Sequence, residues 1–332
     1  MQEHVCVERR QYPNAPAAAA AVRDIWKDHP VSIVSESAHE WCFRVRSGWP
    51  KTPFPDDKAE KVAHAMFGLD ISQINAFHRV EYWTNGRLYL LSLSHSWALW
   101  AWSYALQRPT DSLTLVHLDA HADLEIPALI CSDANGRFTA PAGSHYLDIS
   151  EPASVANFIE HGFIGIGSFI VPLIFANPNC HLVHVEPVEP KPVAPRLAYL
   201  RPRRVAHQSL FGVHERPAAA IENQGEQCYL RLSTLDDVAR LDPCGSVLLD
   251  IDMDYFCNPF EAEERNGKKN ISRHCWEDIE LAIDRVTTVL QHSSWREQVR
   301  IVTVALSPGF FPSQYWPVAL VSLESRLRQI LG

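Results

Sequence analysis

Short apolar runs alternate with longer apolar or amphipathic segments through most of the chain. The runs are four to eight residues long and rich in Leu, Val and Ile, which is typical of buried strands. They occupy residues 87–94, 113–118, 246–249 and 300–306. The longer segments have the length and pattern of helices, at residues 96–107, 151–161, 275–292 and 313–331. Strands that alternate with helices predict an α/β fold of three layers, with a doubly wound, mainly parallel sheet between two layers of helices.

Several segments carry local signals of their own. Asn85-Gly86 between two β-rich runs predicts a hairpin over residues 78–93, because Asn-Gly suits the tight turns that join antiparallel strands. Residues 96–107 contain three tryptophans and are apolar on all sides, which indicates a buried helix. Residues 162–170 predict a glycine-containing strand, which lacks the third glycine of a dinucleotide-binding fingerprint.

The first 77 residues have a mixed pattern. Residues 16–27 and 58–68 predict helices, and residues 31–34 and 41–45 predict short strands. We expect one α/β domain over residues 1–332, with residues 1–77 as an N-terminal extension packed on it.

A proline-rich segment interrupts the second half of the chain. Residues 186–204 contain five prolines and four arginines. This composition indicates either a rigid surface connection or a rim that contacts an extended or acidic partner.

Three of the apolar runs end in side chains that bind metal ions. These side chains are His95, Asp119, His121, Asp123, Asp250, Asp252 and Asp254. Within each run they are spaced by two, so an extended backbone points them the same way. Open α/β sheets form their sites at such strand ends. Because several buried carboxylates are costly without a partner, the pattern predicts a divalent-cation site.

Composition excludes several classes of function. The net charge of −9 argues against nucleic acid as a partner. No apolar run of about 18 residues indicates a membrane span, and the N-terminus does not resemble a secretion signal. The eight cysteines form no CxxC pair, so we expect small buried thiols in a cytoplasmic protein.

The metal-binding residues resemble the ligand set of the arginase (ureohydrolase) superfamily, whose members hold two manganese ions. The matching residues are His95, Asp119, His121, Asp123, Asp250 and Asp252. The resemblance covers mainly residues 87–310. It implies that Asp119 and Asp250 bridge the two ions. His95 and Asp123 would bind the first ion only, and His121 and Asp252 the second only. The related zinc deacetylases keep a smaller, single-metal set, and oxygen and imidazole ligands without thiolate suit Mn²⁺.

The same resemblance implies a reaction. Two ions activate a shared water, which attacks the guanidinium carbon of arginine and releases urea. Asp123 would orient this water and accept its proton. His145 follows a loop at the place where arginases carry a proton-shuttling histidine, although a plain surface histidine is an equal alternative.

Two positions depart from the arginases that act on free arginine. Glu125 lies where those enzymes have an Asn that helps to hold the substrate's α-carboxylate. Ala305 lies near the place of the Glu that grips the guanidinium. The missing carboxylate could come from Asp254, Glu125, Glu186 or Glu261, and the sequence does not choose among them.

The closer resemblance is to peptide arginases of ribosomal peptide natural-product pathways, which convert arginine side chains of a precursor peptide to ornithine. It rests on the segments SLSHSWA, HLDAHADLE, GSVLLDIDMDYF and VALSPGF. An internal arginine has no free α-carboxylate, which fits the change at Glu125. An arginine-containing precursor peptide is therefore the expected partner. A small-molecule ureohydrolase of the agmatinase type and a metal-binding protein without turnover remain as alternatives, and the oligomeric state is left open.

Overall fold

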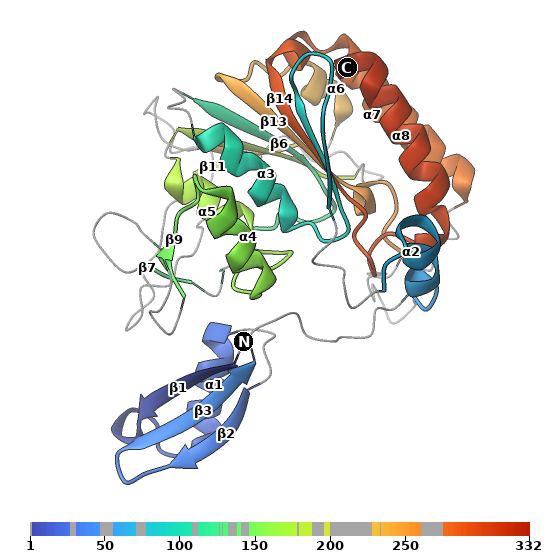
Figure 1. Cartoon of the computed structure of the whole chain (residues 1–332). Coiled ribbons are helices and arrows are strands. Elements are labelled where there is room, and N and C mark those ends of the chain that lie inside the picture. The colour runs from blue at the N-terminus through green and yellow to red at the C-terminus, as the bar shows by residue number, and fades with distance from the viewer. Residues whose placement is uncertain are drawn as a thin grey trace.

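The computed structural model describes residues 2–26, 31–46, 56–70, 78–107, 112–125, 127, 129–131, 138–140, 146–177, 179–187, 196–199, 228–232, 234–259 and 275–332. Within these residues the main sheet has eight strands in the order β11-β12-β10-β6-β13-β14-β5-β4 (Figure 1). The strands are β4 (His78–Tyr82), β5 (Leu88–Ser92), β6 (Leu113–Leu118), β10 (Cys180–Val185), β11 (Arg196–Tyr199), β12 (Cys228–Leu232), β13 (Ser246–Asp252) and β14 (Val299–Ala305). The inner strands are parallel, and β4 and β11 pair antiparallel at the two edges. The predicted mainly parallel sheet is confirmed.

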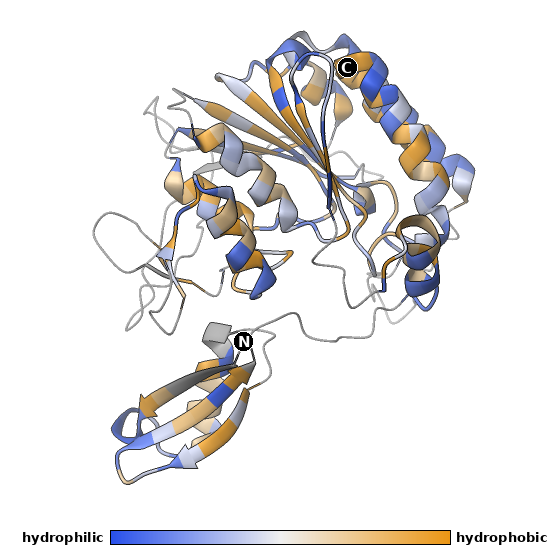
Figure 2. Cartoon of the chain, in the orientation of Figure 1, coloured by the Kyte–Doolittle hydropathy of each residue, from blue (hydrophilic) through white to orange (hydrophobic). Residues whose placement is uncertain are grey.

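Helices cover both faces of this sheet. One face packs with α3 (Trp97–Leu106), α4 (Pro152–Glu160) and α5 (Ile170–Ala176), and the other with α6 (Leu235–Ala239), α7 (Trp276–His292) and α8 (Trp316–Leu331). The alternation of β6 explains how one strand serves both layers, because Leu115 belongs to the first hydrophobic cluster and Val116 to the second. Figure 2 shows hydrophobic residues along the inner strands and mixed hydrophobic and hydrophilic surfaces on α8. The predicted three layers are confirmed.

The hairpin of β4 and β5 fixes one edge of the sheet. Gly86 has a φ of +73°, a conformation that glycine adopts without steric cost, and the Trp83 N–H donates to the Arg87 carbonyl at 2.8 Å. The Arg87 side chain is buried and donates to the carbonyls of Val299 and Leu331. Arg87 thereby ties the hairpin to the start of β14 and the end of α8.

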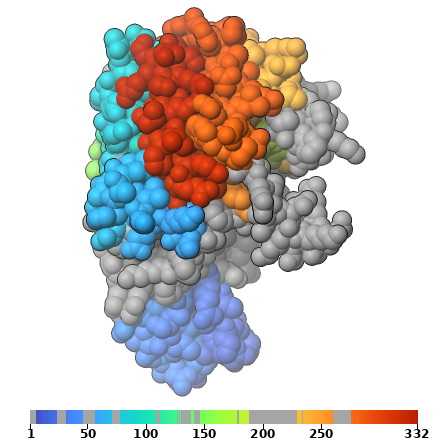
Figure 3. All heavy atoms as spheres, turned by 90° about the vertical axis from the view of Figure 1, so that its right-hand side faces the viewer, coloured from blue at the N-terminus to red at the C-terminus, as the bar shows by residue number. Residues whose placement is uncertain are grey.

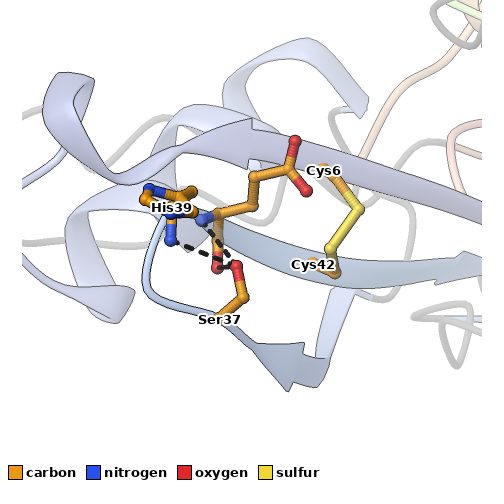
Figure 4. The surroundings of a disulfide bond; sticks show 5 residues. Cys6, Ser37, His39 and Cys42 are labelled. Carbon is orange, nitrogen blue, oxygen red and sulfur yellow. Dashed lines mark hydrogen bonds between the residues drawn. A yellow bond between two sulfur atoms is a disulfide. The ribbon is translucent and has the colours of Figure 1, made fainter.

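The N-terminal residues form a small unit of strands and one helix. Its antiparallel sheet has the order β1-β3-β2, from β1 (Gln2–Glu8), β2 (Val31–Glu36) and β3 (Glu40–Arg46), together with α1 (Ala15–Trp26). Figure 1 shows this unit below the eight-stranded sheet. Ser37 closes the turn between β2 and β3, since its Oγ accepts from the N–H groups of His39 and Glu40 (Figure 4).

A disulfide joins the edge strand β1 to the central strand β3, from Cys6 to Cys42 (Figure 4). The register of β1 on β3 places the two residues directly opposite each other, which brings their sulfur atoms together. The prediction of free buried thiols is therefore wrong for this pair, and it is also wrong for Cys244 and Cys275, which are exposed. Cys180 and Cys257 are buried thiols, as predicted.

Part of the predicted N-terminal extension packs beside the C-terminal helix. In α2 (Ala59–Phe67), Ala59 and Ala63 belong to the same hydrophobic cluster as α7 and α8. The Ser313 N–H donates to Asp56 Oδ2 at 2.6 Å, just before α8 begins. Figure 3 shows the segment around α2 against the start of α8. That residues 1–77 as a whole pack on a single domain stays a prediction.

Two further segments differ from expectation. Residues 162–170 form no strand, because the N–H of Phe163 returns to the Phe158 carbonyl at the end of α4 and the chain then enters α5. Arg196–Tyr199 of the proline-rich segment forms the edge strand β11, and most of that segment lies outside the described residues. In the described part of the chain, no helix has the length and apolar character needed to cross a membrane.

Candidate metal centre

The strand order places the polar strand ends side by side. After β6 the chain continues to β10 on one side of that strand, whereas β13 and β14 lie on the other. This reversal leaves an opening at the carboxyl ends of β6 and β13, where open α/β sheets bind ligands. The last register pair between these strands is Ile251 with Leu118, so Asp252 and Asp119 follow next to each other. His95 comes shortly after β5.

One cluster gathers around Nδ1 of His95. This nitrogen lies 3.2 Å from Asp119 Oδ2, 3.2 Å from Asp123 Oδ2 and 2.9 Å from Asp252 Oδ2. All four side chains are at least nine-tenths buried. Among the described residues, His95 Nδ1 and Asp119 Oδ2 have no hydrogen-bond partner. Buried polar atoms without partners are costly, and a cation between them would satisfy both.

A second cluster gathers around His121. Its Nδ1 lies 3.3 Å from Asp119 Oδ1 and 2.9 Å from Asp254 Oδ2. These three ligand atoms lie within 4.8 Å of one another, close enough to share one ion. Asp119 contributes one carboxylate oxygen to each cluster and can therefore bridge two ions. The His121 side chain is 32% exposed, so the second cluster is the one open to solvent.

Asp250 is placed differently from the other predicted ligands. Its Oδ2 lies 2.9 Å from Nε2 of His95, on the far side of that ring from the first cluster. The same oxygen lies 2.7 Å from His117 Nδ1, and Oδ1 accepts from Thr303 Oγ1 at 2.5 Å. The structure thus brings five predicted ligands together with Asp254, and it directs Asp250 toward residues inside the sheet.

The two clusters perturb the pKa values of their members. Burial alone would lower the pKa of His95, but the charges of Asp250 and Asp252 outweigh it and raise that pKa well above its usual value. Burial and the neighbouring Asp119 raise the pKa of Asp123 to about 7. Burial, with the charges of Asp252 and Asp119, also raises the pKa of Asp254. Without a metal the centre therefore retains protons, which arriving cations must displace.

The backbone around the centre adopts rare conformations. Asp123 and Ser307 have φ values of +48° and +43°, in the left-handed region that residues other than glycine seldom occupy. Such strain is concentrated at functional sites. Ser307 Oγ donates to Asp252 Oδ2 at 2.5 Å, and the Phe310 ring stands edge-on to His121 at 5.5 Å. The loop after β14 therefore contacts both clusters.

The residues proposed for substrate binding are distributed unevenly. Asp254 is 1% exposed and belongs to the second cluster. Glu125 is exposed, and its N–H donates to the Gly167 carbonyl at 2.8 Å while its side chain lies against that glycine. Glu125 is therefore on the surface beside the centre and not inside it.

Of the remaining candidate residues for substrate binding and proton transfer, only Glu186 lies in the described part of the chain. Glu186 forms an ion pair with Arg231 on the neighbouring strand, which engages that carboxylate. His145 and Glu261 lie outside the described residues. The proton-shuttle role of His145 stays a prediction.

Several buried polar residues next to the centre were not predicted from the sequence. They are His117, His184, Thr303 and Ser307. His117 had a usable signal, because it stands two positions before Asp119 and so shares its face of β6. Thr303 and His184 carry no comparable signal, since they become neighbours only through the strand order.

Comparisons with known proteins give one kind of similarity. No protein-family model matches the chain, and no curated protein matches it significantly. Among solved structures, a Bacillus subtilis arginase is similar with a TM-score of 0.30 and 13% identity, over 73% of this chain and 71% of that one. A second arginase structure, from Bacillus subtilis subsp. subtilis str. 168, has a TM-score of 0.28 and 14% identity, over 73% of this chain and 68% of that one. Native arginase from Bacillus caldovelox has a TM-score of 0.27 and 14% identity, over 73% of this chain and 67% of that one. Similarity this low supports no conclusion about function, which is inferred below from the geometry of the centre.

Proposed function

We propose that this protein is a hydrolase that depends on two Mn²⁺ ions and releases urea from arginine side chains of a peptide, leaving ornithine. The observation that carries the proposal is the position of Asp119. Its two oxygens face two separate clusters, each with a histidine Nδ1 and a further carboxylate. One bridging carboxylate between two such clusters is the arrangement that a pair of metal ions requires.

The residues present fit two such ions. His95, Asp119, Asp123 and Asp252 would hold the first, and the orphaned atoms of His95 and Asp119 mark its place. His121 and Asp254, with the second oxygen of Asp119, would hold the other. The donors are oxygen and imidazole nitrogen without thiolate, which suits Mn²⁺. When bound, a metal pair lowers the pKa of a water molecule and orients it.

Side chains of the protein can orient the water, accept its proton and admit the substrate. Asp123 reaches the first cluster from the loop after β6, where it can orient a water and accept its proton. His121 and Phe310 form the partly exposed side of the second cluster, where a planar guanidinium can approach. The Phe310 ring next to His121 is an aromatic group that can attract a cationic side chain.

The choice of a peptide over free arginine rests on Glu125. This exposed carboxylate stands two residues after Asp123, and it would repel the α-carboxylate of free arginine. An internal arginine presents neutral amide groups instead. Contacts along the rest of a peptide supply binding energy that can position the guanidinium at the centre.

The test compares substrates on the Mn²⁺-loaded protein. Urea release and the mass loss of urea minus water per arginine are measured for free arginine and for an arginine peptide with blocked ends. We expect a much higher kcat/KM for the peptide, and no urea from the Asp119→Asn variant. A preference for free arginine would replace the peptide assignment with a small-molecule ureohydrolase. Two bound ions without urea from either substrate would indicate a metal-binding protein without turnover.

A further inference from the structure

A row of buried polar residues crosses the sheet directly beneath the candidate metal centre. The strand registers pair His184 with His117, His117 with Asp250, and Asp250 with Thr303. All four are at most 1% exposed, and they come from four adjacent strands. Polar groups this deep in a parallel sheet are costly unless they are hydrogen-bonded. None of them belongs to the ligand clusters described above.

Asp250 lies in the middle of this row with both oxygens engaged. Thr303 Oγ1 donates to Oδ1, while His95 Nε2 and His117 Nδ1 both approach Oδ2. His95 therefore separates Asp250 from the first cluster, because its other nitrogen, Nδ1, faces Asp119, Asp123 and Asp252. An ion bound to His95 Nδ1 would therefore contact those three carboxylates and not Asp250.

Histidine ligands of metals usually donate their second N–H to a carboxylate or carbonyl, which fixes the tautomer and the orientation of the ring. Asp250 occupies that place for His95. We propose that Asp250 is a positioning residue that aims His95 Nδ1 at the first metal ion and is not itself a ligand, and that Asp252 and Asp254 are the ligands supplied by this strand and the turn after it. The inference rests on the metal-dependent function proposed above and deepens it.

His117 holds Asp250 in that role. Its Nδ1 bonds Asp250 Oδ2 and its Nε2 bonds the His121 carbonyl at 3.1 Å. A carboxylate and a carbonyl both accept, so the two nitrogens of His117 donate. His117 Nε2 also lies 3.4 Å from Asp119 Oδ2, and ligand atoms of His95, His117 and Asp119 are close enough to share an ion. Both nitrogens of His117 are, however, engaged in the two hydrogen bonds above.

His184 repeats the support on the next strand. Its Nε2 donates to the Asp119 carbonyl at 3.0 Å, and its Nδ1 lies 3.0 Å from the Tyr229 hydroxyl. The buried row thus contacts the side chain of His95 and the backbone of Asp119 and His121. It fixes one residue of each cluster together with the bridging carboxylate.

The experiment titrates the full-length, metal-free protein with Mn²⁺ alone. Elemental analysis gives the number of bound ions, and calorimetry gives a Kd for each. We expect Asp250→Asn to bind two ions at saturation, with the Kd of the first raised roughly 10–100-fold and that of the second little changed. Asp252→Asn should lose the first ion outright. An Asp250→Asn protein that binds no ion or only one, as a bridging ligand would require, overturns the inference, and so does an unchanged first Kd.

A matched pair of variants at Thr303 keeps the test valid even if substitution of Asp250 disturbs folding. Thr303→Val removes the hydroxyl that orients Asp250 at nearly constant volume, and Thr303→Ser keeps it. We expect only Thr303→Val to weaken the first ion. Equal weakening of both ions by Thr303→Val would indicate a general structural effect and refute the positioning role. Wild-type protein that binds no Mn²⁺ overturns the inference together with the proposed function. Two bound ions without urea release contradict the proposed reaction alone, because the titration still decides the role of Asp250.

Discussion

Replacing Asp123 with Asn should stabilise the metal-free protein and destabilise the metal-loaded one. Asp123 is a buried carboxylate beside Asp119, and burial and that neighbour raise its pKa from 3.8 to about 7. Asn has nearly the same shape and tolerates the left-handed backbone at this position, but it carries no charge. The substitution therefore removes the repulsion in the empty centre and one ligand of the first ion.

The magnitude follows from the pKa shift. Because the folded protein binds the proton more tightly than the unfolded chain, this carboxylate lowers stability as the pH rises from 3.8 to 7, and the full penalty is present above pH 7. Three pKa units correspond to a penalty of about 4 kcal/mol in the free energy of unfolding. The variant avoids this penalty but loses the contact with His95, so at pH 8 it should be more stable than wild type by about 2 kcal/mol. The midpoint of thermal unfolding should rise by roughly 3–6 °C.

Thermal unfolding with EDTA and with excess Mn²⁺, at pH 5 and pH 8, tests this reasoning. With Mn²⁺, wild-type protein gains about 2.7 kcal/mol for each ion present at a hundred times its Kd, and the variant loses that gain for the first ion. The order of the two midpoints should therefore reverse between EDTA and Mn²⁺. The advantage of the variant in EDTA should shrink at pH 5. A variant that is less stable than wild type in EDTA at pH 8 would refute the reasoning.

Four other substitutions and a change of pH test the rest of the structure. Asp254→Asn should leave one Mn²⁺ per chain and Asp119→Asn none, as elemental analysis would show; two ions in either variant contradict the cluster assignment. Ser307→Ala removes the hydrogen bond to Asp252 and should raise the Kd for Mn²⁺ about tenfold, and an unchanged Kd would count against that contact. Arg87→Met should cost about 3 kcal/mol in urea unfolding without changing the number of bound ions, because it leaves buried carbonyls without a donor. Mn²⁺ binding and urea release should both decline below about pH 6, since ligand histidines must be neutral; a maximum at acid pH would exclude this chemistry.

The fold could be predicted from the sequence wherever the hydrophobic pattern had a clear length and period. The runs that became β5, β6, β13 and β14 are short and apolar, and the first three lead into polar metal-binding side chains. The pattern failed at residues 162–170, because short apolar segments without a period fit a turn and a buried helix as well as a strand. It also failed at Cys6 and Cys42, which are far apart in sequence and meet only through the register of two strands.

The residue types of the site were predictable, but their level along the strand was not. Asp250, Asp252 and Asp254 are spaced by two, so the alternation of a strand assigns them to one side without telling which of them is level with Asp119. That level is set by the pairing of β13 with β6, in which Asp250 lies opposite His117. Register between strands distant in sequence is a tertiary property, and the spacing within one strand does not encode it.

Asp250 lies two residues before the end of β13, whereas the proposed ligands Asp252 and Asp254 lie at its last residue and after it. A ligand must reach past the strand end into the opening of the sheet, whereas a support must stand behind the ligand and be enclosed. Asp250 is fully buried and pairs across the sheet with a residue that is equally enclosed, His117. Neither side chain would be tolerated alone between apolar layers, because an unpaired buried charge costs several kcal/mol. Their occurrence at the same level of neighbouring strands, one step below Asp119 and Asp252, therefore indicates that they are retained for each other and for the orientation of His95.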